Sequence, residues 1–235
     1  MCTKHLLLAL YIGCFLPLAA QSEEQANQNL YHAYELEMGL RLNQEAEGLL
    51  EWDLDGWVGT DENKIRLKLN KTPNPTEKDE AEFAALFSHN ISSFWDAQIG
   101  LRLNTEPDSL IYAVIGLEGL APYFLETEAH LFVSEEGDLS FAMKYEKDIL
   151  LTQKLIARPY VEATFFGQTS LARNTGSGLS NAELGIQTRY EFNRAMALYT
   201  DLKYDRTFGK TREFANRNGD DPNSFTATLG LKFLF

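Results

Sequence analysis

Apolar and polar residues alternate at every second position through most of the chain after residue 29, and this pattern constrains the fold most strongly. The clearest stretch places Ile65, Leu67 and Leu69 on one parity and Lys64, Arg66 and Lys68 on the other. A period of two is that of a β-strand, whose successive side chains point to opposite faces. The alternating segments are 35–42, 50–58, 64–69, 81–89, 95–104, 110–118, 125–133, 141–146, 158–165, 183–191, 198–205 and 225–235. The parity of 81–89 is ambiguous, and 110–118 is mostly apolar on both faces.

The connections between these segments alternate between long and short along the whole chain. The odd-numbered connections are 43–48, 71–80, 104–109, 134–138, 167–178 and 208–223; the even-numbered ones are 60–63, 90–93, 119–122, 150–153 and 193–194. Short periplasmic turns and longer outer loops are typical of outer-membrane barrels, whose strand number is even. A soluble β protein would also alternate, but it would not require this order. The sequence therefore predicts an all-β fold, a transmembrane antiparallel β-barrel of twelve strands over residues 30–235, with both chain ends periplasmic.

The first residues have the pattern of an export signal. Lys4 and His5 precede an almost wholly apolar run, 6–18, and Ala19-Ala20 offers a cleavage point. An uncleaved anchor is the alternative, but a helical span needs about 20 apolar residues. We therefore expect a signal peptide at 1–20 and a short polar periplasmic tether at 21–29. Both cysteines, Cys2 and Cys14, lie within the signal, so the mature chain has no disulfide or thiolate site.

The net charge of −13 argues against nucleic acid as a partner, because phosphates require a basic face. Such a balance suits a surface or lumen that handles cations. No apolar run after residue 20 reaches helical spanning length, so only a closed barrel could cross a membrane. We expect a monomer in the outer membrane, in contact with its lipid.

Many charged residues have the parity of the barrel lumen. The lumen-lining residues that we predict are Glu35, Glu37, Glu51, Asp53, Asp55, Arg66, Lys68, Asp96, Arg102, Arg158, Glu162, Glu183, Arg189 and Glu191, with Arg41 and Lys144 on the same parity. Enclosed charges of this number must pair or be hydrated. Tight pairing would make a plug of side chains, whereas incomplete pairing would leave a narrow wet path that favours cations.

One histidine is a candidate metal ligand. Glu126, Glu128 and His130 share the lumen parity and form one inward column that could hold a divalent ion. The alternative is that His130 is hydrogen-bonded to a neighbouring strand. Met38, Met143 and Met196 share the parity of apolar neighbours and should face lipid, although thioethers are good Cu(I) ligands. His32 has the lipid-facing parity at the mouth of the first strand, and His89 lies at a short turn.

Five strings of the sequence resemble the copper resistance protein B family of outer-membrane proteins. They are Trp52-Asp53-Leu54-Asp55-Gly56-Trp57-Val58-Gly59, Ile91-Ser92-Ser93-Phe94-Trp95-Asp96, Gly119-Leu120-Ala121-Pro122-Tyr123, Leu150-Leu151-Thr152-Gln153-Lys154-Leu155 and Gly176-Ser177-Gly178-Leu179-Ser180. The resemblance covers most of residues 50–235 and implies a barrel that binds copper ions or assists their export across the outer membrane. Many members also carry a Met- and His-rich segment before the barrel, whereas residues 21–49 contain only His32 and Met38.

The resemblance implies a copper ion as the bound species and allows a periplasmic copper-handling protein, such as a multicopper oxidase, as a partner. The alternative function is a small cation-selective or structural barrel without a metal-specific role. An enzyme such as an outer-membrane lipase is the third possibility, with His89 and Ser92 as the nearest candidates for catalysis. Their odd spacing places them on opposite faces of a strand, so we expect no enzymatic activity.

Overall fold

A computed structural model describes residues 30–42, 48–72, 80–106, 109–171, 173–219 and 221–235. The expected signal peptide (1–20) and tether (21–29) lie outside the described residues. The elements are β1 (Tyr31–Leu42), β2 (Gly48–Gly59), β3 (Asn63–Thr72), β4 (Glu80–Ser92), β5 (Trp95–Asn104), β6 (Leu110–Ala121), β7 (Leu125–Ser134), β8 (Leu139–Glu146), β9 (Ile149–Leu150), β10 (Leu155–Phe166), β11 (Gly178–Asn193), β12 (Met196–Thr207), α1 (Gly209–Asn218) and β13 (Asn223–Leu234).

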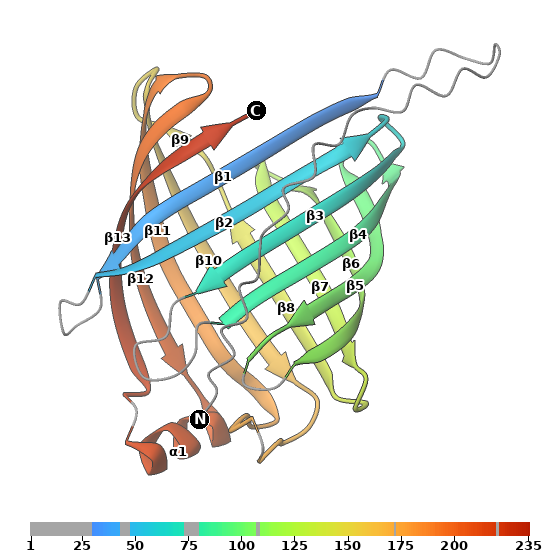
Figure 1. Ribbon diagram of the computed structural model, residues 1–235, viewed down its shortest axis with the longest axis vertical. Coiled ribbons are helices and arrows are strands. Elements are labelled where there is room, and N and C mark those ends of the chain that lie inside the picture. Colours follow the sequence, from blue (N-terminus) through green and yellow to red (C-terminus); the bar gives the residue numbers. More distant parts are fainter. Residues whose placement is uncertain (1–29, 43–47, 73–79, 107–108, 172, 220) are drawn as a thin grey trace, which may run out of the picture.

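The strands form one closed antiparallel barrel (Figure 1). Each strand pairs with its neighbours in the sequence, and β1 pairs with β13 to close the wall. The short strand β9 continues β8, because both pair with β10. β8 and β9 therefore count as one wall strand, and the predicted twelve-stranded barrel is confirmed. In the described residues, no helix has the length and apolar character needed to cross a membrane.

The two ends of the barrel differ in their connections, as predicted. At the short-turn end the strands are joined by residues 60–62, 93–94, 122–124, 151–154 and 194–195. At the other end, the loop end, the connections include 167–177 and 208–222. The chain termini of the barrel meet at the short-turn end, where Tyr34 N donates to Phe235 O at 3.1 Å and Phe235 N donates to Tyr34 O at 2.9 Å.

The last long connection contains a helix, α1, that the alternation did not predict. It lies at the loop end, at the lower left of Figure 1. The helix ends at Gly219, whose φ of 85° is the left-handed conformation that favours glycine after a helix. The Thr211 side chain fastens α1 to the wall, because its Oγ1 accepts from Gly176 N at 2.8 Å and lies 2.6 Å from Ser180 Oγ.

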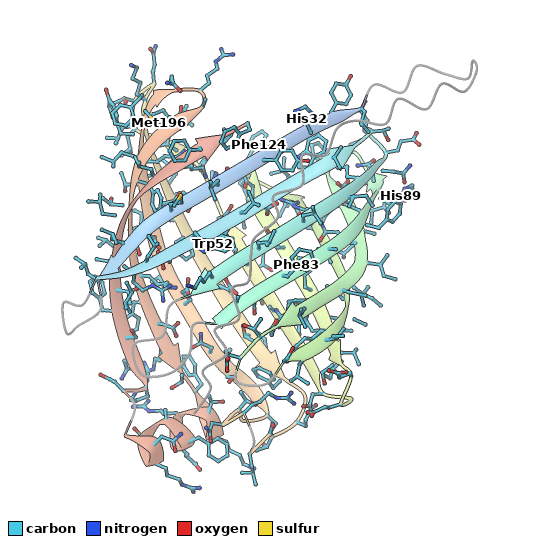
Figure 2. All side chains as sticks on the ribbon, in the orientation of Figure 1. His32, Trp52, Phe83, His89, Phe124 and Met196 are labelled. Atoms are coloured by element: carbon cyan, nitrogen blue, oxygen red, sulfur yellow. The ribbon has the colours of Figure 1, made fainter. Side chains whose placement is uncertain are left out.

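The outer face of the wall is apolar. Ile99 and Leu184 remain 58% and 62% exposed, and many other large apolar side chains share this face. Phe83, which is 42% exposed, lies on the outside of the wall in Figure 2. A continuous apolar surface of this extent suits hydrocarbon and not water, so the outward parity is the lipid-facing one.

The inner face is mostly polar, but one wall carries an apolar cluster. Leu86, Leu110, Tyr112, Val114 and Phe132 pack together inside β4, β6 and β7. The guanidinium of Arg102 lies 4.9 Å from the Tyr112 ring centre and 4.1 Å from that of Phe132. This cluster explains why 110–118 is apolar on both faces: one face meets lipid and the other fills part of the lumen.

Candidate functional site

A cavity of about 590 Å³ lies inside the barrel, and we call it the inner cavity. It is lined by residues of β1, β2 and β3 on one side and of β7, β8, β10, β11 and β12 on the other. Gly119 and Leu120, at the last positions of β6 before a short turn, also line it. The inner cavity therefore extends to the short-turn end, which is the end that we predict to face the periplasm.

Carboxylates outnumber cations in the lining of the inner cavity, twelve to five. The carboxylates are Glu35, Glu37, Glu51, Asp53, Asp55, Glu118, Glu126, Glu128, Glu146, Glu162, Glu183 and Asp201, and the cations are Arg41, Arg66, Lys71, Lys144 and Arg158. In an enclosed space of low dielectric, such an excess attracts cations and repels anions.

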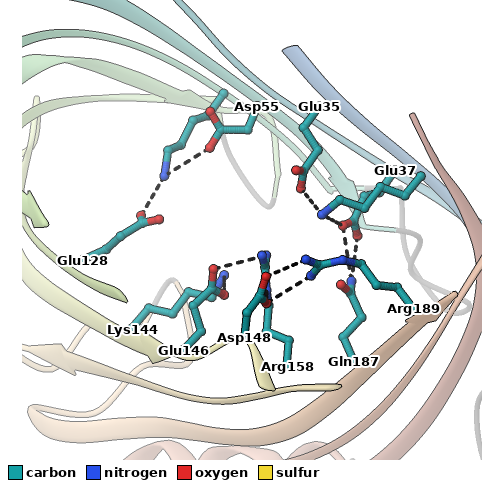
Figure 3. A network of polar contacts seen from close by, with 12 residues as sticks. Glu35, Glu37, Asp55, Glu128, Lys144, Glu146, Asp148, Arg158, Gln187 and Arg189 are labelled. Atoms are coloured by element: carbon teal, nitrogen blue, oxygen red, sulfur yellow. Dashed lines mark hydrogen bonds and ion pairs between the residues drawn. The ribbon is translucent and has the colours of Figure 1, made fainter. Parts of the chain in front are cut away.

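Lys68 links two walls of the barrel through carboxylates. Its Nζ lies 2.6 Å from Glu128 Oε2 on β7 and 3.6 Å from Asp55 Oδ2 on β2 (Figure 3). Arg66 connects the same region further, because its Nε donates to Asp55 Oδ1 at 3.0 Å and its Nη1 pairs with Glu118. These contacts join residues distant in the sequence and hold the side chains in place across the lumen.

A second network surrounds Asp148, which lies between β8 and β9. Arg158 Nε donates to Asp148 Oδ1 at 2.6 Å, and Arg189 Nη1 donates to the same oxygen at 3.0 Å (Figure 3). Arg158 also lies 3.4 Å from Glu146, whose other oxygen is 2.8 Å from Lys144 Nζ. Two arginines and one lysine thus share two carboxylates.

A third network closes the seam between the first and last strands. Lys232 of β13 pairs with Glu35 and lies 3.0 Å from Glu37 Oε1, both on β1. Gln187 Nε2 donates to Glu37 Oε2 at 3.0 Å from across the lumen (Figure 3). Lys232 is only 4% exposed, so this buried cation depends on its two carboxylates.

Four carboxylates of the inner cavity make no ion pair with the residues that the structure describes. They are Asp53, Glu126, Glu162 and Asp201. Asp53 accepts a hydrogen bond from Asn70 Nδ2 at 3.2 Å, and Asp201 accepts one from Tyr160 Oη at 2.9 Å. Glu162 lies directly opposite Glu183 in the β10–β11 ladder, and like charges in that position repel each other.

Tyrosine rings lie close to glycines of the barrel wall and so shape the inner cavity. A Cβ added at Gly39 would lie 2.7 Å from Tyr199 Oη, and one at Gly230 would lie 2.6 Å from Tyr199 Cζ. Gly56 faces Tyr34 in the same manner, with Cε1 of the ring 2.8 Å from an added Cβ. The absence of side chains at these glycines makes room for the rings.

The charged residues predicted to line the lumen lie on the inner face of the structure. Nine of them line the inner cavity, namely Glu35, Glu37, Glu51, Asp53, Asp55, Arg66, Arg158, Glu162 and Glu183. The others contact inward partners around it: Lys68 and Arg189 as described, Asp96 with Lys64 at 2.8 Å, Arg102 with Glu82 at 3.6 Å, and Glu191 with Arg189 at 3.4 Å.

Two of the three members of the predicted metal column contact other residues. His130 is 8% exposed, and its Nε2 lies 2.7 Å from Gln98 Oε1 on β5, so the alternative of a hydrogen bond to a neighbouring strand is present. Glu128 pairs with Lys68, and Glu126 is exposed. Among the described residues, no three His, Cys, Asp or Glu side chains are placed to hold a metal ion together. The metal site at these three residues stays a prediction.

The lining of the inner cavity supplies oxygen ligands. Carboxylates, the hydroxyls of Tyr160 and Tyr199 and the amides of Asn70 and Gln187 face it, whereas no described Met or His residue lines it. Met38 is 42% exposed on the lipid-facing parity, and Met143 and Met196 have that parity as well. His32 and His89 lie near the short-turn end, and His89 Nδ1 is 2.9 Å from Asn63 Oδ1 (Figure 2).

Sequence reasoning did not single out Glu118, Asp148 and Lys232, although each contributes to the networks. Each has the inward parity of its strand: Glu118 continues the even positions of β6, Asp148 those of β8, and Lys232 those of β13. The alternation therefore applies to these three positions as well. It was difficult to recognise because the inner face of β6 is apolar and because the strand is interrupted after Glu146.

The family model of the copper resistance protein B precursor matches residues 29–235. A copper resistance protein B homolog of Pseudomonas syringae pv. tomato is 34% identical over 187 residues, which cover 79% of this chain and 64% of that protein. Copper resistance protein B of Escherichia coli is 34% identical over 185 residues, covering 78% and 62%. The chain thus spans less than two thirds of the length of these curated relatives.

Solved structures with the same architecture include porins. The NanC porin superposes with a TM-score of 0.54 at 12% identity, over 85% of this chain and 98% of that one. The KdgM porin, in complex with disordered oligogalacturonate, gives a TM-score of 0.51 at 6% identity, over 86% and 98%. At these identities the likeness concerns the fold alone.

Proposed function

The chain belongs to the copper resistance protein B family, and from that premise we propose that it limits copper toxicity by handling copper ions in its inner cavity. The protein is an outer-membrane β-barrel, so the handling would consist of binding copper or assisting its export across that membrane. Because the curated relatives are longer, their whole activity is carried over to this chain as a proposal only.

The excess of carboxylates in the inner cavity carries this proposal. Twelve carboxylates face five cations, and Asp53, Glu162 and Asp201 make no ion pair with the described residues. The pair Glu162 and Glu183 would be relieved of repulsion by a cation between or beside them. A copper ion that enters from the short-turn end would pass along the negatively charged lining of the inner cavity.

The ligand chemistry favours Cu(II) over Cu(I). Cu(I) prefers thioether and thiolate ligands, whereas Cu(II) accepts oxygen and nitrogen donors. The lining of the inner cavity is built from oxygen donors, and the methionines Met38, Met143 and Met196 have the lipid-facing parity. We therefore assign Cu(II) as the ion that the inner cavity accepts.

A deletion strain distinguishes copper handling from a barrel without a metal-specific role. Loss of the gene should lower growth in copper, and the wild-type gene should restore it. The variant E162Q/E183Q should restore it only partly, whereas Glu136→Gln, a change at a 63% exposed loop side chain, should act like wild type. A deletion strain that tolerates copper like its parent would contradict the proposal.

The predicted column Glu126, Glu128 and His130 is tested by metal titration. If the column binds Cu(II), the variant His130→Ala of the purified barrel should have a lower affinity for Cu(II). The reason is that the imidazole is the strongest Cu(II) ligand among the three side chains. Unchanged binding by this variant would remove the column and leave the carboxylates of the inner cavity as the copper ligands.

We also propose that a periplasmic copper-handling protein, such as a multicopper oxidase, exchanges copper at the short-turn end. Glu35, Glu118 and Glu126 lie at the ends of strands there and line the inner cavity. A photo-crosslinking residue in place of exposed Tyr123 in the β6–β7 turn should capture this partner, whereas the same residue at Asn218 in α1 should not. Equal capture at both positions would speak against a specific partner.

A further inference from the structure

Four cations on and beside α1, at the loop end, differ from those in the lumen. Arg206 at the end of β12, with Lys210, Arg212 and Arg217 of α1, makes no ion pair with the residues that the structure describes, and we call these four residues the α1 patch. In contrast, cations such as Lys68, Arg158 and Lys232 in the lumen each contact two carboxylates. The α1 patch is thus a concentration of uncompensated positive charge on a chain whose net charge is −13.

Arg206 lies at the boundary between the lipid-facing surface and the loops. On β12 the outward positions are Leu198, Thr200, Leu202, Tyr204 and then Arg206, all exposed. Along the strand, apolar residues come first, then a tyrosine and then an arginine. The same order is found across a membrane leaflet, where hydrocarbon is followed by the interface and then by the headgroups. In a barrel whose long loops face outward, this order would place the Arg206 guanidinium at the outer-leaflet headgroups.

Aromatic rings hold two of these guanidinium groups in place. Arg206 Cζ is 5.3 Å from the ring centre of Phe208, and Arg217 Cζ is 5.9 Å from that of Phe214. Lys210, Phe214 and Arg217 are spaced i, i+4 and i+7, so they share one side of α1. The helix contains one acid, Glu213, against its three cations.

We propose that the α1 patch binds the phosphate groups of the phosphorylated glycolipid that forms the outer leaflet of the outer membrane. Arginine recognises phosphate through paired N–H donors, and lysine adds a point charge. The aromatic rings of Tyr204, Phe208 and Phe214 would contact the apolar part of the lipid near its headgroup. This proposal depends on the outer-membrane location and not on copper handling.

The test measures binding of diphosphoryl lipid A to the purified barrel in detergent by native mass spectrometry. The variant R206A/K210A/R217A should bind about a hundredfold more weakly than wild type, since each surface cation contributes roughly a tenfold effect at most. A matched control, K147A/K154A/R194A, removes the same charge from the short-turn end, where these cations also make no ion pair with described residues. It should bind like wild type.

A second comparison uses the wild-type barrel alone and does not depend on how any variant folds. Lipid A without its two phosphates should bind weakly to the wild-type barrel. Its affinity should be about that of diphosphoryl lipid A for the variant R206A/K210A/R217A. Equal binding of the two lipids to wild type would overturn the proposal. Equal losses in the two triple variants would also overturn it, because they would indicate a nonspecific effect of net charge.

Discussion

Asp148 interrupts the eighth strand of the wall and brings two arginines to one carboxylate. Its oxygens accept from Arg158 and Arg189, which come from β10 and β11. Arg189 is 8% exposed, so its guanidinium depends on protein partners more than on water. Removing one member of such a network leaves the other charges without compensation. A residue outside regular β-structure is therefore central to the lumen.

Replacing Asp148 by alanine should destabilise the barrel. We expect the free energy of unfolding to fall by about 1–3 kcal/mol, since three charge-assisted hydrogen bonds are lost while the carboxylate is 26% exposed. Urea unfolding in lipid vesicles, followed by tryptophan fluorescence, measures the change. The matched variant is Glu136→Ala, whose carboxylate is 63% exposed and 3.5 Å from Arg173. A loss for Asp148→Ala no larger than that for Glu136→Ala would show that the network does not stabilise the fold.

Parity in the sequence indicates which face of a strand a charged residue takes, but not which of the inward residues form ion pairs. From the sequence alone, Lys68 could form an ion pair with any inward carboxylate. In the structure it pairs with Glu128 and so joins β3 to β7 across the lumen. Such contacts depend on the curvature and tilt of the closed wall, which no single strand specifies. The same limit applies to His130, whose contact with Gln98 required the register of β5, β6 and β7.

At the scale of the elements, glycines and tyrosines on adjacent strands determine how closely side chains pack on the inner wall. Gly56 of β2 lies under the ring of Tyr34 of β1, and the two residues are direct partners in the ladder. A glycine inside a strand loses favourable packing unless a neighbouring aromatic ring covers it. The tyrosine supplies that cover here.

The variant Gly56→Ala should therefore be destabilised by about 1–3 kcal/mol, because the new methyl group overlaps the Tyr34 ring. In a Tyr34→Ala background, the same change should cost less than about 0.5 kcal/mol, and the double-mutant cycle gives the coupling. Gly48→Ala on the same strand is the control, since no atom lies within 4 Å of an added Cβ there. Equal costs at Gly56 in the two backgrounds would contradict the contact.

The elements themselves were largely predictable. Alternation located every wall strand, because each strand faces lipid on one side and a polar lumen on the other. It was ambiguous for β4, where inward Ala84 and Leu86 are as apolar as outward Phe83. It missed α1, because a polar helix of ten residues at the membrane surface has neither the period nor the apolar content of a transmembrane strand.

At the scale of the whole molecule, negative and positive charge occupy different places. The inner cavity carries an excess of carboxylates, whereas the α1 patch at the loop end carries uncompensated cations. The net charge of −13 describes neither region. A cation in the lumen and a phosphate at the outer surface would each meet the opposite charge.

This separation predicts the ion preference of the lumen. The measurement is the reversal potential of the current through the barrel in a planar bilayer with a KCl gradient. Its sign should be the one that indicates selectivity for cations. The variant D53N/E162Q/D201N removes three of the four lining carboxylates that make no ion pair with described residues, and it should move the reversal potential toward zero. The loop variant E135Q/E136Q is the control and should leave it unchanged. Anion selectivity in the wild-type barrel would contradict the role assigned to the carboxylates.

The orientation of the whole barrel is open to a direct test, because residues 21–235 contain no cysteine. Long loops face outward and short turns face the periplasm in such barrels. A single cysteine at exposed Asn218 in α1 should therefore react with a membrane-impermeant maleimide on intact cells. One at exposed Arg194, in the turn between β11 and β12, should react only after the outer membrane is permeabilised. The reverse pattern would place α1 in the periplasm, and the α1 patch could then not meet the outer leaflet.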